Sequence, residues 1–513
     1  MNTLAAYIVL ALAGSLYGCA VGPNFAKPAA PEGAGYGPLA SQTTSSSIQQ
    51  GEAQRFVQDM DMPGQWWAAF GSQPLNDLIE KALKANPTIA AAQATLRVAH
   101  ENVLAQRGAF YPTVTAGLSD SRNLTPTRAL SPVSASGNPY YSLFTGQLSI
   151  SYTPDVFGLN RRTVESLAAE AEKQRFQLEA TYLSLTANVV AAAVQEALLH
   201  DWIGAQQDTI RADTQIRDIM KRQYEAGEMA QADLLAQEAV LAQAQQALIP
   251  LQSQLAQQGH LLAALAGGFP NDPVADDFQL ASLHLPEDLP VSVSSKLVEQ
   301  RPDIRAAAAS MQAASAQIGI AIANRLPQVS LTASLGTSPN SIADAFTPFN
   351  QFFNLAAGLV QPIFDGGTLR HRQRAVEAEF DVSVAQYRST LIAAFQNVAD
   401  VLVALQSDAD ALQAAVKSAR TAARSVEIAQ GQLRLGEGSY LSVLAAEQLY
   451  QTSRNALVQA QARRLSDTAA LFAALGGGWW NRDDVAPDIQ AMASANFYPR
   501  RAGSRSEDSS RSE

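Results

Sequence analysis

Residues 160–227 read NRRTVESLAAEAEKQRFQLEATYLSLTANVVAAAVQEALLHDWIGAQQDTIRADTQIRDIMKRQYEAG, and this stretch decides the fold. It contains no proline and almost no glycine, which predicts one uninterrupted helix. At ~1.5 Å per residue such a helix is ~100 Å long, far beyond the three or four turns usual in globular proteins. The stretch therefore predicts a rod-like element.

Apolar residues recur along this stretch at spacings of three and four, as in a coiled coil. The seam comprises Leu178, Tyr182, Leu185, Val189, Ala192, Leu199, Ile203 and Ile210. Polar residues interrupt it at Glu196, Gln206 and Asp213. Taken alone, the stretch favours a soluble coiled-coil rod. The rest of the chain changes that interpretation because the pattern occurs twice.

The sequence repeats itself roughly 210 residues further along the chain. Landmarks correspond in order: Asn86-Pro87 with Arg301-Pro302, residues 154–158 with 362–366, and 226–228 with 435–437. We infer that one unit is duplicated, and that each copy holds a short alanine-rich helix, a long helix and a returning helix.

Composition excludes several classes of function. The net charge is −11, whereas a protein that binds nucleic acid needs a basic surface. The single cysteine excludes a disulfide framework within the chain. The five histidines are scattered without a second ligand at helical spacing, and no phosphate-binding glycine loop is present. No catalytic residue, metal or cofactor is expected.

The cysteine follows a short apolar run, residues 5–16, of signal-peptide length. The sequence around Cys19 resembles a bacterial lipoprotein box, which implies cleavage before Cys19 and a lipid, such as palmitate, attached to it. Ala20 after the cysteine is associated with sorting to the outer membrane. The alternative is a chance cysteine behind an apolar N-terminus. No other stretch is expected to form a transmembrane helix.

After Pro112 the apolar period changes from that of a helix to that of a strand. Residues 113–119, 146–152 and 328–335 alternate between apolar and polar side chains, and residues 353–362 do so less clearly. About ten residues with one apolar face fit a tilted transmembrane β-strand. A soluble β-hairpin with one solvent-exposed face has the same local pattern.

Topology favours the membrane interpretation. Four strands cannot close a barrel, and an open sheet edge cannot face lipid. Single-chain outer-membrane barrels start at eight strands, so we expect three chains to pool twelve. The long helices are polar on nearly all faces. This pattern suits helices arranged side by side in a cylinder, where each helix packs on two neighbours.

These features together resemble the TolC-like outer membrane efflux family, in particular its lipoprotein branch. The matching residues are 18–23, Trp66-Trp67 with Phe70, 78–87, Arg301-Pro302, 362–367 and 474–479. The resemblance implies a mostly α protein with a small β part: a homotrimer with a twelve-stranded outer-membrane barrel continued by a twelve-helix periplasmic barrel.

The resemblance also implies an organisation along the chain. It comprises a lipoprotein signal peptide at 1–18, an N-terminal tether and equatorial segment at 19–72, a first repeat at 73–268, a second repeat at 289–478 and a polar tail at 479–513. Each repeat contributes helices and two barrel strands. The expected location is the outer membrane, with a lipid anchor and an extension into the periplasm.

The resemblance assigns the functional ends of the molecule. Helix tips that contact a periplasmic adaptor protein would lie at Ala226, Gly227, Glu228, Leu435, Gly436 and Gly438. The adaptor would in turn meet an inner-membrane pump of the RND type. The aperture would be closed by residues at and after the second tip, namely Glu437, Tyr440, Leu441 and Glu447.

The expected gate departs from the family pattern. Members commonly carry aspartates at the positions of Ser442 or Ala445, so the acidic ring is in doubt here. Glu437 and Glu447 are the nearby acids that would replace it; Glu447 as a solvated helix residue is the alternative. The predicted function is a passive efflux duct for drugs, toxic compounds or metal ions. A lipid-anchored periplasmic coiled-coil adaptor or scaffold, and a lipid-anchored enzyme, are the competing hypotheses.

Overall fold

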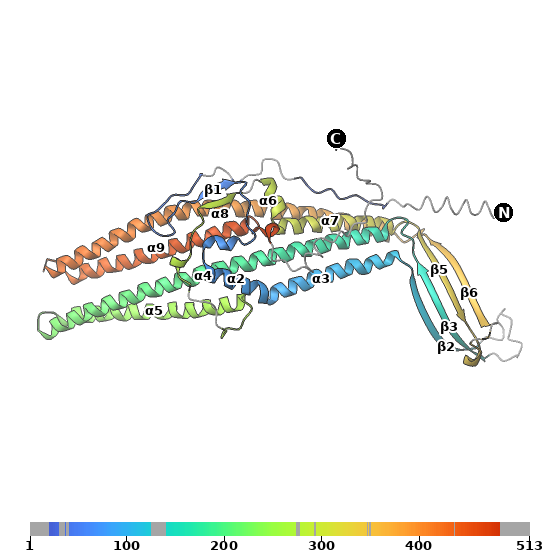
Figure 1. Cartoon of the computed structure of the whole chain (residues 1–513), viewed down its shortest axis with the longest axis horizontal. Helices are drawn as coiled ribbons and strands as arrows, with labels where there is room; N and C mark the ends of the chain where they lie inside the picture. The colour runs from blue at the N-terminus through green and yellow to red at the C-terminus, as the bar shows by residue number, and fades with distance from the viewer. Residues whose placement is uncertain are drawn as a thin grey trace, which may run out of the picture.

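The computed structural model describes residues 20–29, 36, 41–124, 140–272, 278–291, 294–345, 347, 350–435 and 437–482. Long helices run side by side along an elongated molecule, a sheet lies at one end, and two helix tips lie at the other (Figure 1). The predicted signal peptide, Cys19, Gly436 and the tail beyond residue 482 lie outside the described residues.

The helices are α2 (Gln73–Ala85), α3 (Pro87–Arg107), α4 (Leu159–Glu225), α5 (Gln231–Leu265), α6 (Ser294–Gln300), α7 (Pro302–Ala323), α8 (Thr368–Arg434) and α9 (Tyr440–Ala474). Helix α4 confirms the long helix expected from the opening stretch. The order α3–β2–β3–α4–α5 recurs as α7–β5–β6–α8–α9, and α4 and α8 are each 67 residues long. The two halves therefore share one plan.

The strands are β1 (Arg55–Gln58), β2 (Thr113–Leu124), β3 (Tyr140–Tyr152), β4 (Asp288–Val291), β5 (Gln328–Thr337) and β6 (Gln351–Val360). Strands β2-β3-β5-β6 form an antiparallel sheet in that order, and β3 pairs with β5 across the two halves. Strand β3 begins earlier than the alternation predicted, because its first residues pair with the end of β2: Tyr140 lies opposite Leu124.

The register of this sheet separates its two faces. One row of paired residues is apolar: Val114, Ile150, Ala333 and Leu355. The adjacent row, which points to the other face, is polar: Thr115, Ser149, Ser334 and Asn354. Leu118, Phe353 and Leu355 are 81% to 85% exposed. Within the described residues, nothing covers the apolar face.

Two of the three polar residues that interrupt the seam of α4 bind the neighbouring helix, α5. The side-chain amide of Gln206 donates to the carbonyl oxygen of Ala244 at 2.8 Å. The side-chain amide of Gln237 donates to the carboxylate of Asp213 at 3.3 Å. Both partners lie in α5, so these polar side chains fix the register of the α4–α5 pair where a purely apolar seam could slide.

The largest core lies at mid-length, where the short elements surround the long helices. Trp66, in the short helix η1 (Trp66–Phe70), is buried and stacks on Phe472 of α9 with ring centroids 5.5 Å apart. Strand β1 pairs in parallel with β4, at the start of the second repeat. The predicted N-terminal tether is therefore partly built into the core, and Gln54 is fully buried.

No transmembrane helix is expected from the sequence beyond the apolar N-terminal run, but hydropathy identifies further candidates. Three described helices, α4, α7 and α8, are long and apolar enough to cross a membrane by length and composition alone, with a mean hydropathy of 1.3 over 18 residues. The cause is their content of alanine, valine and isoleucine, which raises hydropathy without producing a broad apolar face.

Candidate functional site

Both helix tips lie at the end of the molecule opposite the sheet (Figure 1). In the first tip, Gly227 has a φ of 76°, the left-handed conformation that ends many helices. The amide of Glu228 donates to the carbonyl oxygen of Gln223 at 2.8 Å. Ala226 and Glu228 are exposed, so this turn is a compact, solvent-facing loop.

The second tip has the same closing bond, with the amide of Glu437 donating to the carbonyl oxygen of Gln432 at 2.9 Å. Leu435 and Leu441 are 76% and 74% exposed in the single chain. Two large apolar side chains at the extreme end of a rod are free to contact other molecules or other copies of the chain.

Ser442 takes part in starting α9. Its amide donates to the hydroxyl oxygen of Ser439 at 3.2 Å, and its own hydroxyl donates to the carbonyl oxygen of Ser439 at 2.6 Å. An aspartate at this position would lack that hydroxyl donor. Tyr440, next to the cap, is partly buried, and burial raises the pKa of its hydroxyl.

Glu447 is not a freely solvated residue. The side-chain amide of Gln430 in α8 donates to its carboxylate at 3.1 Å. Burial raises the pKa of Glu447, and the charge of Asp213 on α4 raises it further. Burial also raises the pKa of Asp213. Glu447 is therefore half-buried and bound to α8, whereas Glu437 is exposed at the tip.

The sequence reasoning missed a bond between the two helix pairs. Arg454 of α9 donates to the carboxylate of Asp208 on α4 at 3.0 Å, and Asp208 also pairs with Arg211. Trp202 of α4 donates its ring N–H to the carbonyl oxygen of Asn455 at 3.4 Å. No sequence signal pairs these residues, because they are about 250 positions apart and each lies on a mixed polar face.

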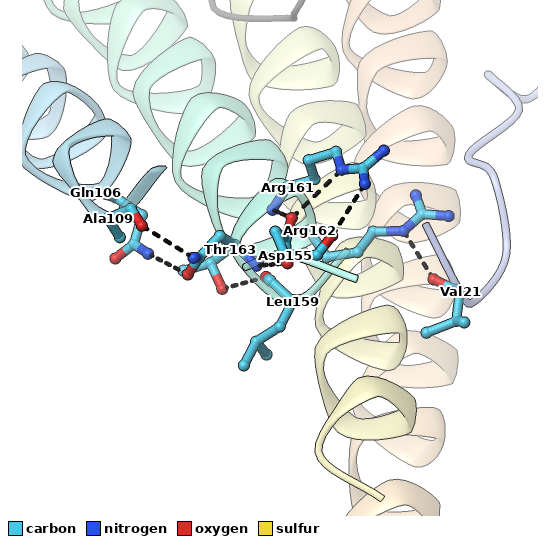
Figure 2. Close-up of polar contacts among 9 residues, drawn as sticks. Val21, Gln106, Ala109, Asp155, Leu159, Arg161, Arg162 and Thr163 are labelled. Carbon is cyan, nitrogen blue, oxygen red and sulfur yellow. Dashed lines mark hydrogen bonds and ion pairs between the residues drawn. The ribbon is translucent and has the colours of Figure 1, made fainter. Parts of the chain in front are cut away.

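At the other end, Asp155 organises the change from strand β3 to helix α4 (Figure 2). One carboxylate oxygen accepts from the amide of Asn160 at 2.9 Å and the other from the amide of Arg161 at 3.0 Å. Asp365 has the same role before α8, and these bonds hold the pKa of Asp365 below its usual value. A carboxylate at a helix N-terminus satisfies amides that otherwise lack partners.

Comparison with known proteins places this geometry in a family. Residues 78–268 and 293–477 match the family described as outer membrane efflux protein. The chain belongs to the outer membrane efflux protein family. The two matched segments coincide with the two halves of the fold. As a family member, the chain is the outer-membrane channel component of an efflux system, with a helical body that extends into the periplasm.

Individual proteins of known name are similar to this chain over most of its length. The pyoverdine export outer membrane protein OpmQ of Pseudomonas aeruginosa is 30% identical over 426 residues, covering 81% of this chain and 87% of its own length. The probable efflux pump outer membrane protein TtgC of Pseudomonas putida is 27% identical over 91% of this chain and 94% of its own. The CmeC outer membrane channel of Campylobacter jejuni has a TM-score of 0.83 at 22% identity, covering 93% of this chain and 98% of its own, and shows the same fold.

Proposed function

We propose that three copies of the chain assemble into a closed duct through the outer membrane, with a twelve-stranded β-barrel continued by a twelve-helix periplasmic barrel. The observation that carries this proposal is the four-stranded sheet. In the described chain, its outer strands β2 and β6 each pair on one side only. Three copies of four strands supply the twelve that a barrel of this kind needs.

The two faces of the sheet support the same arrangement. The apolar rows suit lipid on the outside, and the polar row that ends at Asn354 suits a water-filled lumen. A soluble sheet domain would need a second layer over Phe353 and Leu355, and within the described residues none lies there.

Neighbouring residues on β6 provide a matched test. Leu355→Lys places a charge on the apolar face at the middle of β6, at a cost of about 2–4 kcal/mol near the bilayer midplane, whereas Asn354→Lys places the same charge on the polar face. We expect Leu355→Lys to reduce the amount of trimer in outer-membrane fractions and Asn354→Lys to leave it intact. Native mass of the purified protein should be three times the chain mass of 54.5 kDa, less the signal peptide.

Other outcomes identify the alternative functions. Thin monomeric or dimeric rods that become soluble once the lipid is removed, and that tolerate both lysine substitutions equally, would reject the duct. They would favour the lipid-anchored periplasmic adaptor or scaffold instead.

The periplasmic end is proposed as the aperture and the adaptor-binding end. Leu441, with Tyr440, Glu437 and Glu447, would form the constriction, because a three-fold axis brings each residue to the opening three times. The helix tips, with the exposed residues 226–228, Leu435 and Glu437, would contact a periplasmic adaptor, which connects the duct to an inner-membrane pump of the RND type. The protein itself catalyses no reaction, and transport energy comes from that pump.

The transported substrates are proposed to be small molecules. OpmQ is named for pyoverdine export, and a TtgC protein of another Pseudomonas putida strain is named for toluene efflux. Selectivity in a passive duct depends on its width and lining charge, so drugs, other toxic compounds and metal ions all remain in the proposed class.

A lipid on Cys19 is proposed as a second attachment to the outer membrane. Such a lipid tethers the chain without spanning the bilayer, so the barrel would supply the membrane-spanning part. Metabolic labelling with palmitate should mark the wild-type protein and leave Cys19→Ser unlabelled.

A further inference from the structure

The first described residues, 20–24, lie in a site built from both halves of the protein. Ala20 lies against Gly158, at the start of α4, and Gly22 lies against Gly319 in α7. The amide of Val21 donates to the carbonyl oxygen of Phe157 at 3.1 Å. The N-terminal segment is thus seated where strand β3 becomes helix α4, at the sheet end of the molecule.

Arg162 supplies most of the polar contacts of this site (Figure 2 shows its bond to Val21). Its Nε donates to the carbonyl oxygen of Val21 at 2.9 Å. Its Nη2 donates to the carbonyl oxygen of Gly22 and to the side-chain oxygen of Asn24, each at 3.1 Å. Its Nη1 pairs with Glu165 at 2.7 Å.

The burial of Arg162 shows that these contacts are needed. Its side chain is 4% exposed, and a buried guanidinium is tolerated only when its donors are bonded. The acceptors come from Glu165 and from the N-terminal segment. Release of the segment would remove the acceptors on Val21, Gly22 and Asn24 from the Arg162 guanidinium together.

Glycines permit the close approach of the segment. A Cβ on Gly22 would lie 2.5 Å from the Cα of Gly319, and a Cβ on Gly158 would lie 2.6 Å from the Cα of Ala20. Gly22 also has a φ of 95°, which L side chains rarely adopt. Phe25 continues the contact by packing on a cluster that includes Ile304 and Tyr387.

We propose that Arg162 and its glycine neighbours form a receptor that holds residues 20–24 and so fixes the lipid attachment point at the junction of strand and helix. Cys19 precedes Ala20 by one peptide bond, and consecutive Cα atoms are ~3.8 Å apart. The lipid position therefore follows from the receptor; this step rests on the proposed lipid anchor. Arg162 is a positioning residue, and the anchor is fixed to the duct wall.

Three variants test the receptor. Arg162→Gln removes the guanidinium that donates to the segment. Gly22→Ala introduces a Cβ that clashes with Gly319, and this change lies in the segment rather than in the helices. Val21→Ala is the matched control, because Val21 contributes only backbone atoms to the polar contacts.

The readout is chymotrypsin cleavage after Phe25 in the detergent-purified full-length protein, followed as the mass of the fragment that starts at Ala26. We expect cleavage to be about tenfold faster or more in Arg162→Gln and Gly22→Ala, since proteolysis tracks the population of the released segment. Val21→Ala should be cleaved at the wild-type rate.

If Gly22→Ala is cleaved no faster than wild type, or if Val21→Ala is cleaved as fast as Arg162→Gln, the receptor is rejected. Palmitate labelling gives a separate answer. An unlabelled wild-type protein rejects the lipid anchor, while the cleavage rates still report on the receptor. A labelled protein that loses its label about tenfold faster in the two release variants than in the wild type supports both.

Discussion

Arg464 of α9 allows a quantitative test of how the N-terminal segment is held at mid-length. It is 1% exposed and donates to the carbonyl oxygens of Gln50 at 2.5 Å and Glu52 at 2.9 Å, and to the side-chain oxygen of Gln54 at 3.0 Å. We expect Arg464→Met to release residues 41–56, because methionine keeps the apolar stem but donates no hydrogen bond.

The magnitude follows from these contacts. Each hydrogen bond to a charged group contributes about 1.5–3 kcal/mol, so three such bonds set an upper bound near 9 kcal/mol. Water can reach the freed acceptors, since Glu52 is exposed, and leaving a buried neutral acceptor without its donor costs about 1–3 kcal/mol. Taking ~3 kcal/mol, the segment should open more than a hundredfold more often, at 1.4 kcal/mol per factor of ten.

Hydrogen–deuterium exchange of peptides covering residues 41–56 measures this opening. The amides of Thr43 and Gly51 report directly, because both are bonded within the segment. Arg420→Met is the matched control: Arg420 donates to the hydroxyl of Ser47 at 2.9 Å but is exposed, so less than about 1 kcal/mol is expected. Equal exchange in the two variants would refute the assignment of Arg464 as the main contact.

Two further predictions concern pH and the aperture. Burial, with a hydrogen bond and charge repulsion from Asp467, raises the pKa of Asp408 to about 7, so the folded state retains a proton that the unfolded chain loses. The free energy of unfolding should therefore fall as the pH rises from ~4 to ~7. Thermal unfolding across this range should show a smaller fall for Asp408→Asn than for the wild type. A variant with the wild-type pH profile would exclude Asp408 as the cause. Leu441→Ala should widen the proposed constriction and raise single-channel conductance in planar bilayers, whereas Leu449→Ala, about two turns further along α9, should not; unchanged conductance in Leu441→Ala would place the gate elsewhere.

The long helices, the four strands and the duplication could be predicted from the sequence. These features are local: helix α4 follows from a run without proline, and the strands follow from a change of period after Pro112. The two helix tips were predicted from their glycines, of which Gly227 takes the left-handed conformation. Local backbone preferences and side-chain periodicity suffice for these elements.

The contacts that hold the elements together required the tertiary structure. Asp213 was visible only as a break in an apolar seam, and its partner Gln237 could not be identified from spacing. Arg162 and Arg464 appeared as ordinary helix residues, yet both are buried and both bind the N-terminal segment. A buried charge is stable only where distant acceptors converge on it, and that convergence is a property of the folded chain rather than of any local pattern.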